Sequence, residues 1–271
     1  MRVVLISEVA PAVEGLTAML RAEGHEPVAL LCVRHGGDRY TDLRDLIEAA
    51  TGLDVVMPSS RGRIAPLLRH FEPDLALCLG FPWKIPADAI AVPRHGIVNG
   101  HPSLLPRFRG PSPVSWAIRA QETEIGFTFH YMDAELDTGN ILAQEPVPLG
   151  TEHTWEELTP KIAGAVGRLL PIVLERVARG DAGEPQDEAM ASYHGTFEPE
   201  FAWIDWSRTM AEIERQVRAW RFQPTAMELR GALAELDGET VRVLRVSREL
   251  GRGRAVACSD GTLWVVETEP A

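Results

Sequence analysis

The sequence is poor in cysteine and has no long hydrophobic run. Its 271 residues include three cysteines, Cys32, Cys78 and Cys258, and no two of them lie close together along the chain. Neither a disulfide framework nor a thiolate metal site is therefore indicated. No apolar run approaches the roughly 18 residues that a membrane-spanning helix needs. These absences favour a globular protein of the reducing cytoplasm with no membrane contact.

Positive charge is also scarce. Lys and Arg total 27 against 39 Asp and Glu, which gives a net charge of −12, and Lys84 and Lys161 are the only lysines. Such a chain repels polyanions and disfavours non-specific binding to nucleic acid. The rest of the composition, 45% hydrophobic and 24% charged, is that of an ordinary globular protein.

Glycine-rich nucleotide loops are missing. The first strand-to-helix turn, residues 7–15 (SEVAPAVEG), lacks the glycines that let a dinucleotide pyrophosphate approach the backbone. No Walker-type GK[ST] follows an expected strand, and no His-x-x-x-His or Cys-x-x-Cys spacing is present. A nicotinamide or flavin cofactor is therefore disfavoured, and we expect no metal.

Apolar runs alternate with amphipathic stretches in the first ninety or so residues, which is typical of a βαβ series. We expect strands at 3–6, 28–33, 53–57, 75–79, 96–100, 126–132 and 141–147. Helices are expected at 12–23, 42–50, 63–71, 112–121 and 159–179. Ser112 is the expected N-cap of the fourth helix, and Pro171 should kink the fifth or split it in two. The predicted fold class is α/β, with a Rossmann-like, mostly parallel sheet.

A polar stretch without periodicity, at about 180–200, suggests a linker. We therefore expect a catalytic domain at 1–182, a linker at 183–199 and a small β-rich domain at 200–271. The small domain begins with a helix at 207–220. Short alternating runs follow it at 226–229, 241–246, 254–258 and 263–266.

The residues that could take part in catalysis or binding lie mainly between positions 96 and 143. One strand ends in Asn99-Gly-His101, and a second leads into an acidic turn that closes with Asp137-Thr-Gly139. Because ligands sit at the carboxyl ends of strands in open α/β sheets, we expect both groups to converge on one cleft. Each signal is weak alone, since an Asn before a turn usually bonds to the backbone.

Three linked patterns in this segment resemble the N-formyltransferase family. The patterns are Asn99-x-His101-Pro-Ser-Leu-Leu-Pro106, Arg109-Gly110-x-x-Pro113 and Leu136-Asp137-Thr-Gly139. The family includes methionyl-tRNA formyltransferase, sugar N-formyltransferases, glycinamide ribonucleotide transformylases and formyltetrahydrofolate hydrolases. A weaker resemblance covers nearly the whole chain, and IDW with VRAW within 204–220 resembles the start of the OB-like C-terminal domain of the transfer-RNA enzyme.

The resemblance implies an enzyme that moves a formyl group from 10-formyltetrahydrofolate to an amine. Its catalytic residues would be Asn99, His101 and Asp137. Asn99 would donate a hydrogen bond to the oxyanion, His101 would donate a second one or carry the proton, and Asp137 would orient the imidazole. His130, in the strand before the acidic turn, is expected to be a core or surface residue, with lining of the cleft as the alternative.

The resemblance also implies a folate site and a cis peptide bond between Leu105 and Pro106. Folate would be flanked by Phe81, Trp83, Lys84 and Ile85, by Ser103, Leu104, Leu105 and Pro106, and by Asp133 and Glu135. Residues 81–85 depart from the family in side-chain identity, so their position is the firmer expectation. Arg107, Arg109 and Trp116 are candidates for binding the acceptor, although loop capping and buried aromatic packing are alternative roles for them.

The acceptor that we expect is a small-molecule amine, such as an amino sugar or a biosynthetic amino compound. The transfer-RNA enzyme carries a lysine-rich insertion after its second strand, whereas here residues 34–39 pass almost directly into a helix. From Glu198 onward, 10 arginines face 13 acids, a net charge of 10 − 13 = −3, which suits a polyphosphate poorly. The alternatives are a methionyl-tRNA formyltransferase, a formyltetrahydrofolate hydrolase in which water replaces the amine, and a non-catalytic module that binds folate or a sugar nucleotide.

Overall fold

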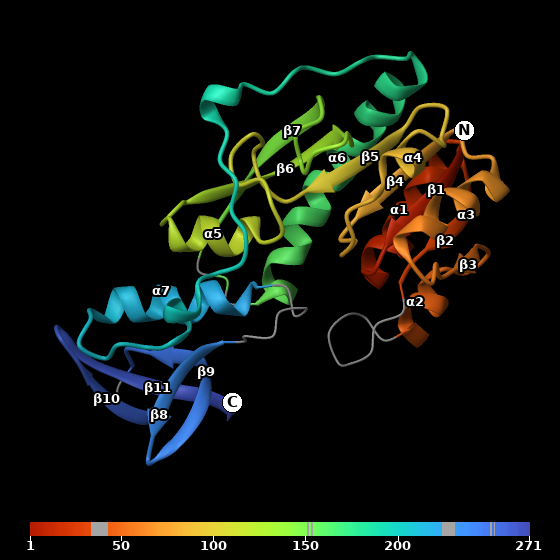
Figure 1. Ribbon diagram of the computed structural model, residues 1–271. Coiled ribbons are helices and arrows are strands. Elements are labelled where there is room, and N and C mark those ends of the chain that lie inside the picture. Colours follow the sequence, from red (N-terminus) through yellow and green to blue (C-terminus); the bar gives the residue numbers. More distant parts are fainter. Residues whose placement is uncertain (34–42, 151, 153, 224–230, 250, 252) are drawn as a thin grey trace. The chain divides into compact units, whose positions relative to one another are not determined.

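The computed structural model describes residues 1–33, 43–150, 152, 154–223, 231–249, 251 and 253–271 (Figure 1). The chain divides into two compact units. The first comprises Met1–Arg109, Gly126–Val147 and Lys161–Ser192, and the second comprises Gly110–Ile125, Pro148–Pro160 and Tyr193–Ala271. The domain limits expected from the sequence stay a prediction. The expected run at 226–229 and the turn at 34–39 lie outside the described residues.

A seven-stranded sheet in the order β3-β2-β1-β4-β5-β6-β7 carries the functional residues. Strands β1 to β5 pair in parallel, and β6 runs antiparallel to β5. The predicted mostly parallel, Rossmann-like sheet is thereby confirmed. The strands are β1 (Arg2–Ser7), β2 (Glu26–Leu31), β3 (Asp54–Val56), β4 (Leu75–Leu79), β5 (Ile97–His101), β6 (Glu124–Tyr131) and β7 (Ile141–Pro148).

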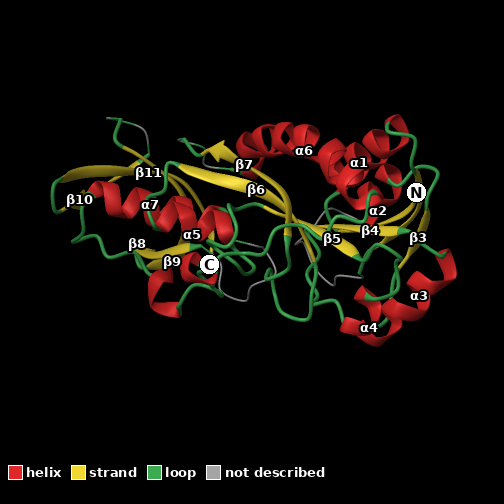
Figure 2. Ribbon diagram, turned by 90° about the horizontal axis from the view of Figure 1, so that it is seen from above, coloured by secondary structure: helices red, strands yellow, loops and turns green. Residues whose placement is uncertain are grey.

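Helices cover both faces of this sheet, which is why its central strands are almost uniformly apolar (Figure 2). On one face lie α1 (Ala10–Ala22), α2 (Leu43–Ala49) and α6 (Trp155–Ala178), and on the other lie α3 (Ile64–Phe71) and α4 (Ala87–Ile90). Beneath α3 and α4, a core of buried side chains includes Val4, Ile6, Ala29, Leu31, Ile64, Leu68 and Ala76. The site described below is therefore built on a rigid, well-filled layer.

Two helices differ in detail from expectation. Pro171 does not divide α6, which runs as one helix from Trp155 to Ala178. Leu170 and Val173, on either side of the proline, are completely buried, and this packing offsets the missing backbone N–H. Ser112 does precede α5 (Pro113–Arg119), but its hydroxyl donates a hydrogen bond to Gln223 Oε1 at 2.9 Å and does not cap the helix.

The second unit contains α7 (Met210–Arg221) and a four-stranded antiparallel sheet in the order β10-β11-β9-β8. These strands are β8 (Ala232–Leu236), β9 (Glu239–Ser247), β10 (Arg254–Cys258) and β11 (Gly261–Pro270). The expected β-rich character of this region is confirmed, and its OB-like nature stays a prediction. Short 3-10 turns occur at Arg61–Arg63, Glu188–Met190 and Pro199–Ala202. Across the described residues, no helix combines the length and apolar character that crossing a bilayer would need.

Candidate active site

Asn99 and His101 lie at the end of β5 and line the same face of the sheet, because alternate residues of a strand point to the same side. The antiparallel partner β6 places His130 directly opposite Asn99 and Thr128 opposite His101. Asn99 Nδ2 lies 3.1 Å from His130 Nε2, and the two imidazole centroids are 6.4 Å apart. The sheet register therefore adds a second histidine to the predicted pair.

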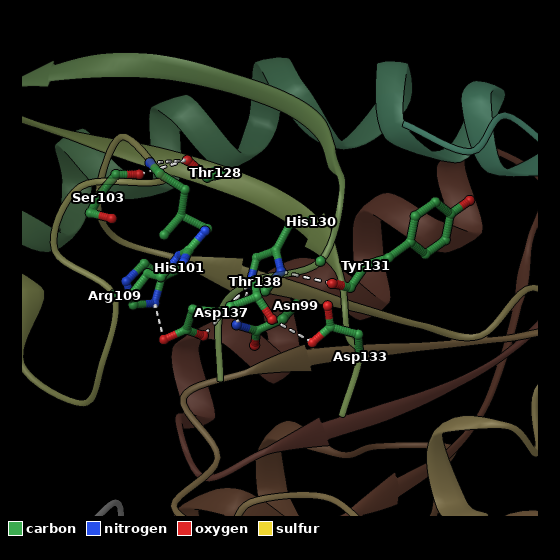
Figure 3. A network of polar contacts seen from close by, with 12 residues as sticks. Asn99, His101, Ser103, Arg109, Thr128, His130, Tyr131, Asp133, Asp137 and Thr138 are labelled. Carbon is green, nitrogen blue, oxygen red and sulfur yellow. Dashed lines mark hydrogen bonds and ion pairs between the residues drawn. The ribbon is translucent and has the colours of Figure 1, made fainter. Parts of the chain in front are cut away.

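Asp137 reaches this cluster by a route that differs from the predicted one. We expected both polar groups to follow the carboxyl ends of strands at a shared edge of the sheet. Strand β6 is antiparallel to β5, so the carboxyl end of β6 lies beside the start of β5, where Tyr131 pairs with Val98. The turn after β6 carries Asp137 back to the histidines (Figure 3). Asp137 Oδ2 lies 3.8 Å from His101 Nδ1, and Oδ1 lies 3.7 Å from His130 Nε2. Both separations exceed a hydrogen bond, so the carboxylate acts on the rings through its charge.

The turn that holds Asp137 is closely specified. Asp137 has φ 58°, in the left-handed region. A Cβ on Gly139 would lie 1.9 Å from the Tyr131 carbonyl oxygen, so no larger residue fits there without a backbone shift. Asp133 Oδ1 accepts hydrogen bonds from Thr138 Oγ1 at 2.6 Å and from the Glu135 N–H at 3.0 Å. These contacts explain why an aspartate, a threonine and a glycine occur together in this turn.

One ring nitrogen of His101 is hydrogen-bonded to the protein backbone. Its Nε2 lies 2.9 Å from the Phe108 carbonyl oxygen, and because a carbonyl only accepts, Nε2 carries the hydrogen. Nδ1 is then the ring nitrogen that faces Asp137. With 5% of its surface exposed, His101 is held in one orientation, with its basic nitrogen toward the carboxylate.

His130 is held neutral. Burial lowers its pKa to about 4, and the negative charge of Asp137 only partly opposes this effect. Nδ1 donates to its neighbour's carbonyl, that of Tyr131, at 2.8 Å, so Nε2 has the lone pair and accepts from Asn99 Nδ2. Within the described part of the chain, the second amide N–H of Asn99 has no protein acceptor. That N–H is a donor fixed in direction by a buried imidazole.

The predicted folate residues lie on loops of the first unit. Lys84 Nζ lies 3.8 Å from Glu135 Oε2, which brings together two of the predicted segments. The rings of Phe81 and Trp83 meet edge to face, with their centroids 6.1 Å apart. Ile85 and Leu105 are buried, whereas Asp133 is exposed. Ser103 Oγ donates to the Arg107 carbonyl, and Leu104 lies against Gly126. The peptide bond between Leu105 and Pro106 is cis, as the resemblance implied.

The three residues predicted to bind the acceptor have different surroundings. Arg107 is exposed, with its guanidinium 5.0 Å from the Phe108 ring centroid. Arg109 is buried and bonded to Gln186 and Glu188. Trp116, in the second unit, stacks on His194 at 4.5 Å, and its Nε1 donates to the Gly195 carbonyl. Acceptor binding by these three residues stays a prediction.

Sequence reasoning gave His130 little weight and did not identify Gln186. Gln186 Nε2 donates to the carbonyls of Asp137 and Gly139, at 2.8 Å each. Neither residue has a local signal: His130 matters because of the register of β6, and Gln186 lies in a polar, aperiodic stretch. Among the described residues, no group of three or more His, Cys, Asp or Glu side chains is arranged to hold a metal ion.

Comparison with known proteins assigns both parts of the sequence. A formyl transferase family model matches residues 2–174, and a model of the formyl transferase C-terminal domain matches residues 197–271. A methionyl-tRNA formyltransferase of Citrifermentans bemidjiense is 34% identical over 215 residues. That alignment covers 74% of this chain and 66% of the relative, just under two thirds of its length.

Solved structures share the fold. HypX from Aquifex aeolicus, crystallised in complex with tetrahydrofolic acid, superposes with a TM-score of 0.75 at 20% identity, over 99% of this chain and 44% of that protein. A sugar N-formyltransferase from a Shewanella species superposes with a TM-score of 0.68, also at 20% identity, over 93% of this chain and 99% of that one. At these identities the likeness is one of fold, and the chain spans less than half of HypX.

Proposed function

Because the chain belongs to the formyl transferase family, we propose that it moves a formyl group from 10-formyltetrahydrofolate to the amino group of a small molecule, such as an amino sugar or a biosynthetic amino compound. One observation carries the proposal. In the first unit, the Asp137 carboxylate lies within 3.8 Å of both His101 and His130, and His130 in turn orients the amide of Asn99.

The chemistry requires these three kinds of group. The acceptor amine attacks the formyl carbon, its new C–N bond places negative charge on the formyl oxygen, and the bond from that carbon to folate N10 then breaks. One proton leaves the amine and one reaches N10, so the products are a formamide and tetrahydrofolate. The free N–H of Asn99 serves the developing oxyanion. His101 Nδ1 can take and return the proton, and Asp137 stabilises the imidazolium in between.

The formyl donor fits the residues that lie near this cluster. 10-Formyltetrahydrofolate supplies the one-carbon unit and is consumed as a substrate. We place it along residues 81–85, 103–106 and 133–137, since the Lys84–Glu135 ion pair joins the first and last of these segments. HypX, which shares the fold, was crystallised with tetrahydrofolic acid, and this supports a folate site in the chain.

The preference for a small acceptor rests on charge. The whole chain carries a net charge of −12 and the region from Glu198 a net charge of −3, whereas a transfer RNA is bound through its phosphates by Lys and Arg. A sugar N-formyltransferase shares the fold over nearly its whole length, which is compatible with such an acceptor. An amine on a small molecule needs no extended basic surface.

A direct test is incubation of the protein with 10-formyltetrahydrofolate and a panel of amines, including amino sugars, nucleotide-linked amino sugars and aminoacyl-tRNA. Mass spectrometry should detect the gain of one formyl group by a small amine. Asp137→Asn, which keeps the size of the side chain but removes its charge, should lose most of this activity. Rapid formate release without any acceptor would replace the proposal with a hydrolase, and folate binding without turnover would replace it with a binding module.

Methionyl-tRNA is the second candidate acceptor, because the relative from Citrifermentans bemidjiense carries that name at 34% identity and a C-terminal domain model of the same family matches residues 197–271. Filter binding with initiator Met-tRNA at two salt concentrations separates the candidates. Tight binding that weakens steeply with salt, together with formylation of the aminoacyl group, would establish methionyl-tRNA as the acceptor. Weak binding with formylation of a small amine would exclude it.

A further inference from the structure

The polar stretch after α6 was expected from the sequence to be a plain linker. It contacts both segments that form the candidate active site, which are the turn that carries Asp137 and the loop after β5. Its residues 186–192 belong to the same compact unit as Asn99, His101 and Asp137. Gln186, at its start, bonds to the turn that carries Asp137. Ser192, at its end, bonds to the loop that holds His101. We call Gln186, Ser192 and Arg109, which bonds to both of them, the brace.

At the first end, Gln186 closes the Asp137 turn. Its Nε2 carries two hydrogens, and both are used: one goes to the Asp137 carbonyl and one to the Gly139 carbonyl, at 2.8 Å each. The Asp137 carbonyl belongs to the peptide unit that follows the Asp137 Cα, and the Gly139 carbonyl lies two residues further on, so the two bonds hold the backbone of residues 137–139. Gln186 is half-buried, so water competes less for these bonds than it would at an exposed position.

At the second end, Ser192 closes the loop after β5. Its Oγ accepts from the Phe108 N–H at 2.9 Å, its N–H donates to the Pro106 carbonyl at 3.1 Å, and its carbonyl accepts from the Arg109 N–H at 2.9 Å. The Phe108 carbonyl is the acceptor for His101 Nε2. Ser192 therefore fixes the position of Phe108, and the Phe108 carbonyl in turn fixes the imidazole of His101.

Arg109 ties the two ends together. Its Nε and Nη2 donate to Gln186 Oε1 at 3.1 and 2.8 Å, and its Nη1 and Nη2 donate to the two carboxylate oxygens of Glu188 at 3.0 and 2.7 Å. Only 7% of Arg109 is exposed. The guanidinium orients the Gln186 amide so that its oxygen points to Arg109 and its nitrogen points to the Asp137 turn.

The backbone at both held points is in an unusual conformation. Asp137 has φ 58° and Phe108 has φ 57°, and neither is glycine. Asp tolerates this left-handed region, whereas Phe seldom adopts it, so the conformation of Phe108 persists because surrounding contacts hold it. Each of the two residues is bonded by one end of the brace. The contacts that hold the strained backbone of Phe108 therefore also fix the carbonyl that accepts from His101 Nε2, and Gln186 holds the turn that carries Asp137.

We propose that Gln186 is a positioning residue for formyl transfer, acting through the Asp137 turn, with Arg109 and Ser192 completing the brace. This inference rests on the proposed function and deepens it. It assigns Arg109 a role in orienting Gln186, whereas the sequence left acceptor binding and loop capping open for this residue.

The test uses the full chain with Gln186→Ala and Gln186→Glu. The glutamate keeps an oxygen for Arg109 but has no hydrogens for the Asp137 and Gly139 carbonyls. Both variants should lower kcat by about 100-fold, the cost expected of a misplaced catalytic group, while KM for 10-formyltetrahydrofolate changes less than threefold. Met190→Ala, in the same stretch but outside the brace and with an exposed side chain, should keep wild-type kcat.

A second readout is independent of turnover. With 15N-labelled histidine, the imidazole signals of His101 and His130 should shift in both Gln186 variants and stay in place in Met190→Ala. Unchanged kcat and unchanged imidazole signals in folded Gln186→Ala would overturn the proposal, and so would full recovery by Gln186→Glu. If the wild-type protein formylates no amine but the imidazole signals still respond to Gln186, then the proposed function has failed and the brace stands.

Discussion

Asn99 Nδ2 donates to His130 Nε2 across 3.1 Å, between two directly paired residues of antiparallel strands. Burial keeps His130 neutral by lowering its pKa to about 4, so this acceptor is present throughout the physiological range. The bond leaves one N–H of Asn99 for a ligand and sets its direction. A pair of neighbouring strands thus builds a preorganised hydrogen-bond donor.

Removing that donor should slow the chemical step. We expect Asn99→Ala to lose about two to three orders of magnitude in kcat, since an oxyanion donor contributes roughly 2.7–4 kcal/mol of transition-state stabilisation. Asn99→Asp should be at least as slow, because it has no N–H and brings a second negative charge toward Asp137. Steady-state kinetics with the identified amine measures both variants. A kcat within threefold of wild type in either one would rule out an oxyanion role.

His130 should affect rate more than binding. His130→Phe keeps an aromatic ring, but the acceptor for Asn99 Nδ2 is lost and the amide can rotate. We expect kcat to fall about tenfold, the equivalent of roughly 1.4 kcal/mol for one oriented hydrogen bond, with KM for the formyl donor little changed. A crystal structure of the variant should show Asn99 in more than one rotamer. An unchanged rate with a reoriented Asn99 would contradict the argument.

Gly139 should tolerate no side chain. Its Cβ would lie 1.9 Å from the Tyr131 carbonyl oxygen, so Gly139→Ala must displace the turn that carries Asp137. We expect at least a 100-fold loss of kcat. Gly15→Ala is the matched control, because nothing lies within 4 Å of its Cβ, and in the interior of α1 it should raise stability by about 0.5–1 kcal/mol. Kinetics and thermal unfolding distinguish the two variants, and equal effects would refute the steric explanation.

Glu8 should make stability depend on pH. Burial raises the pKa of its carboxyl group to about 7 from 4.5, although the carboxylate accepts a hydrogen bond from the Val33 N–H. The native chain therefore holds this proton at pH values where the unfolded chain has lost it. The contribution of the neutral carboxyl is complete below pH 4.5 and is lost as pH rises through 7, at a cost of roughly 3 kcal/mol.

Glu8→Gln keeps an oxygen acceptor for Val33 and stays neutral at every pH. Its free energy of unfolding should match wild type near pH 4 and exceed it by up to roughly 3 kcal/mol at pH 8. Urea denaturation at the two pH values measures this difference. A difference of the same size at both pH values would mean that charge on Glu8 is not the cause.

Local patterns in the sequence were enough for the sheet and for the identity of the central residues. The alternation of apolar runs and amphipathic stretches predicted all seven strands of the large sheet, because strand and helix periods are properties of adjacent residues. The Asn99-x-His101 and Asp137-Thr-Gly139 patterns were also visible, since each depends on a few consecutive positions.

Only the tertiary structure decided what surrounds those residues. The antiparallel direction of β6 places His130 opposite Asn99, and the turn after β6 brings Asp137 next to His130. Gln186, 49 positions beyond Asp137, closes that turn from a stretch whose composition indicated only a linker. Strand direction, register and contacts between distant segments follow from how the whole core closes, and no short window of sequence encodes that.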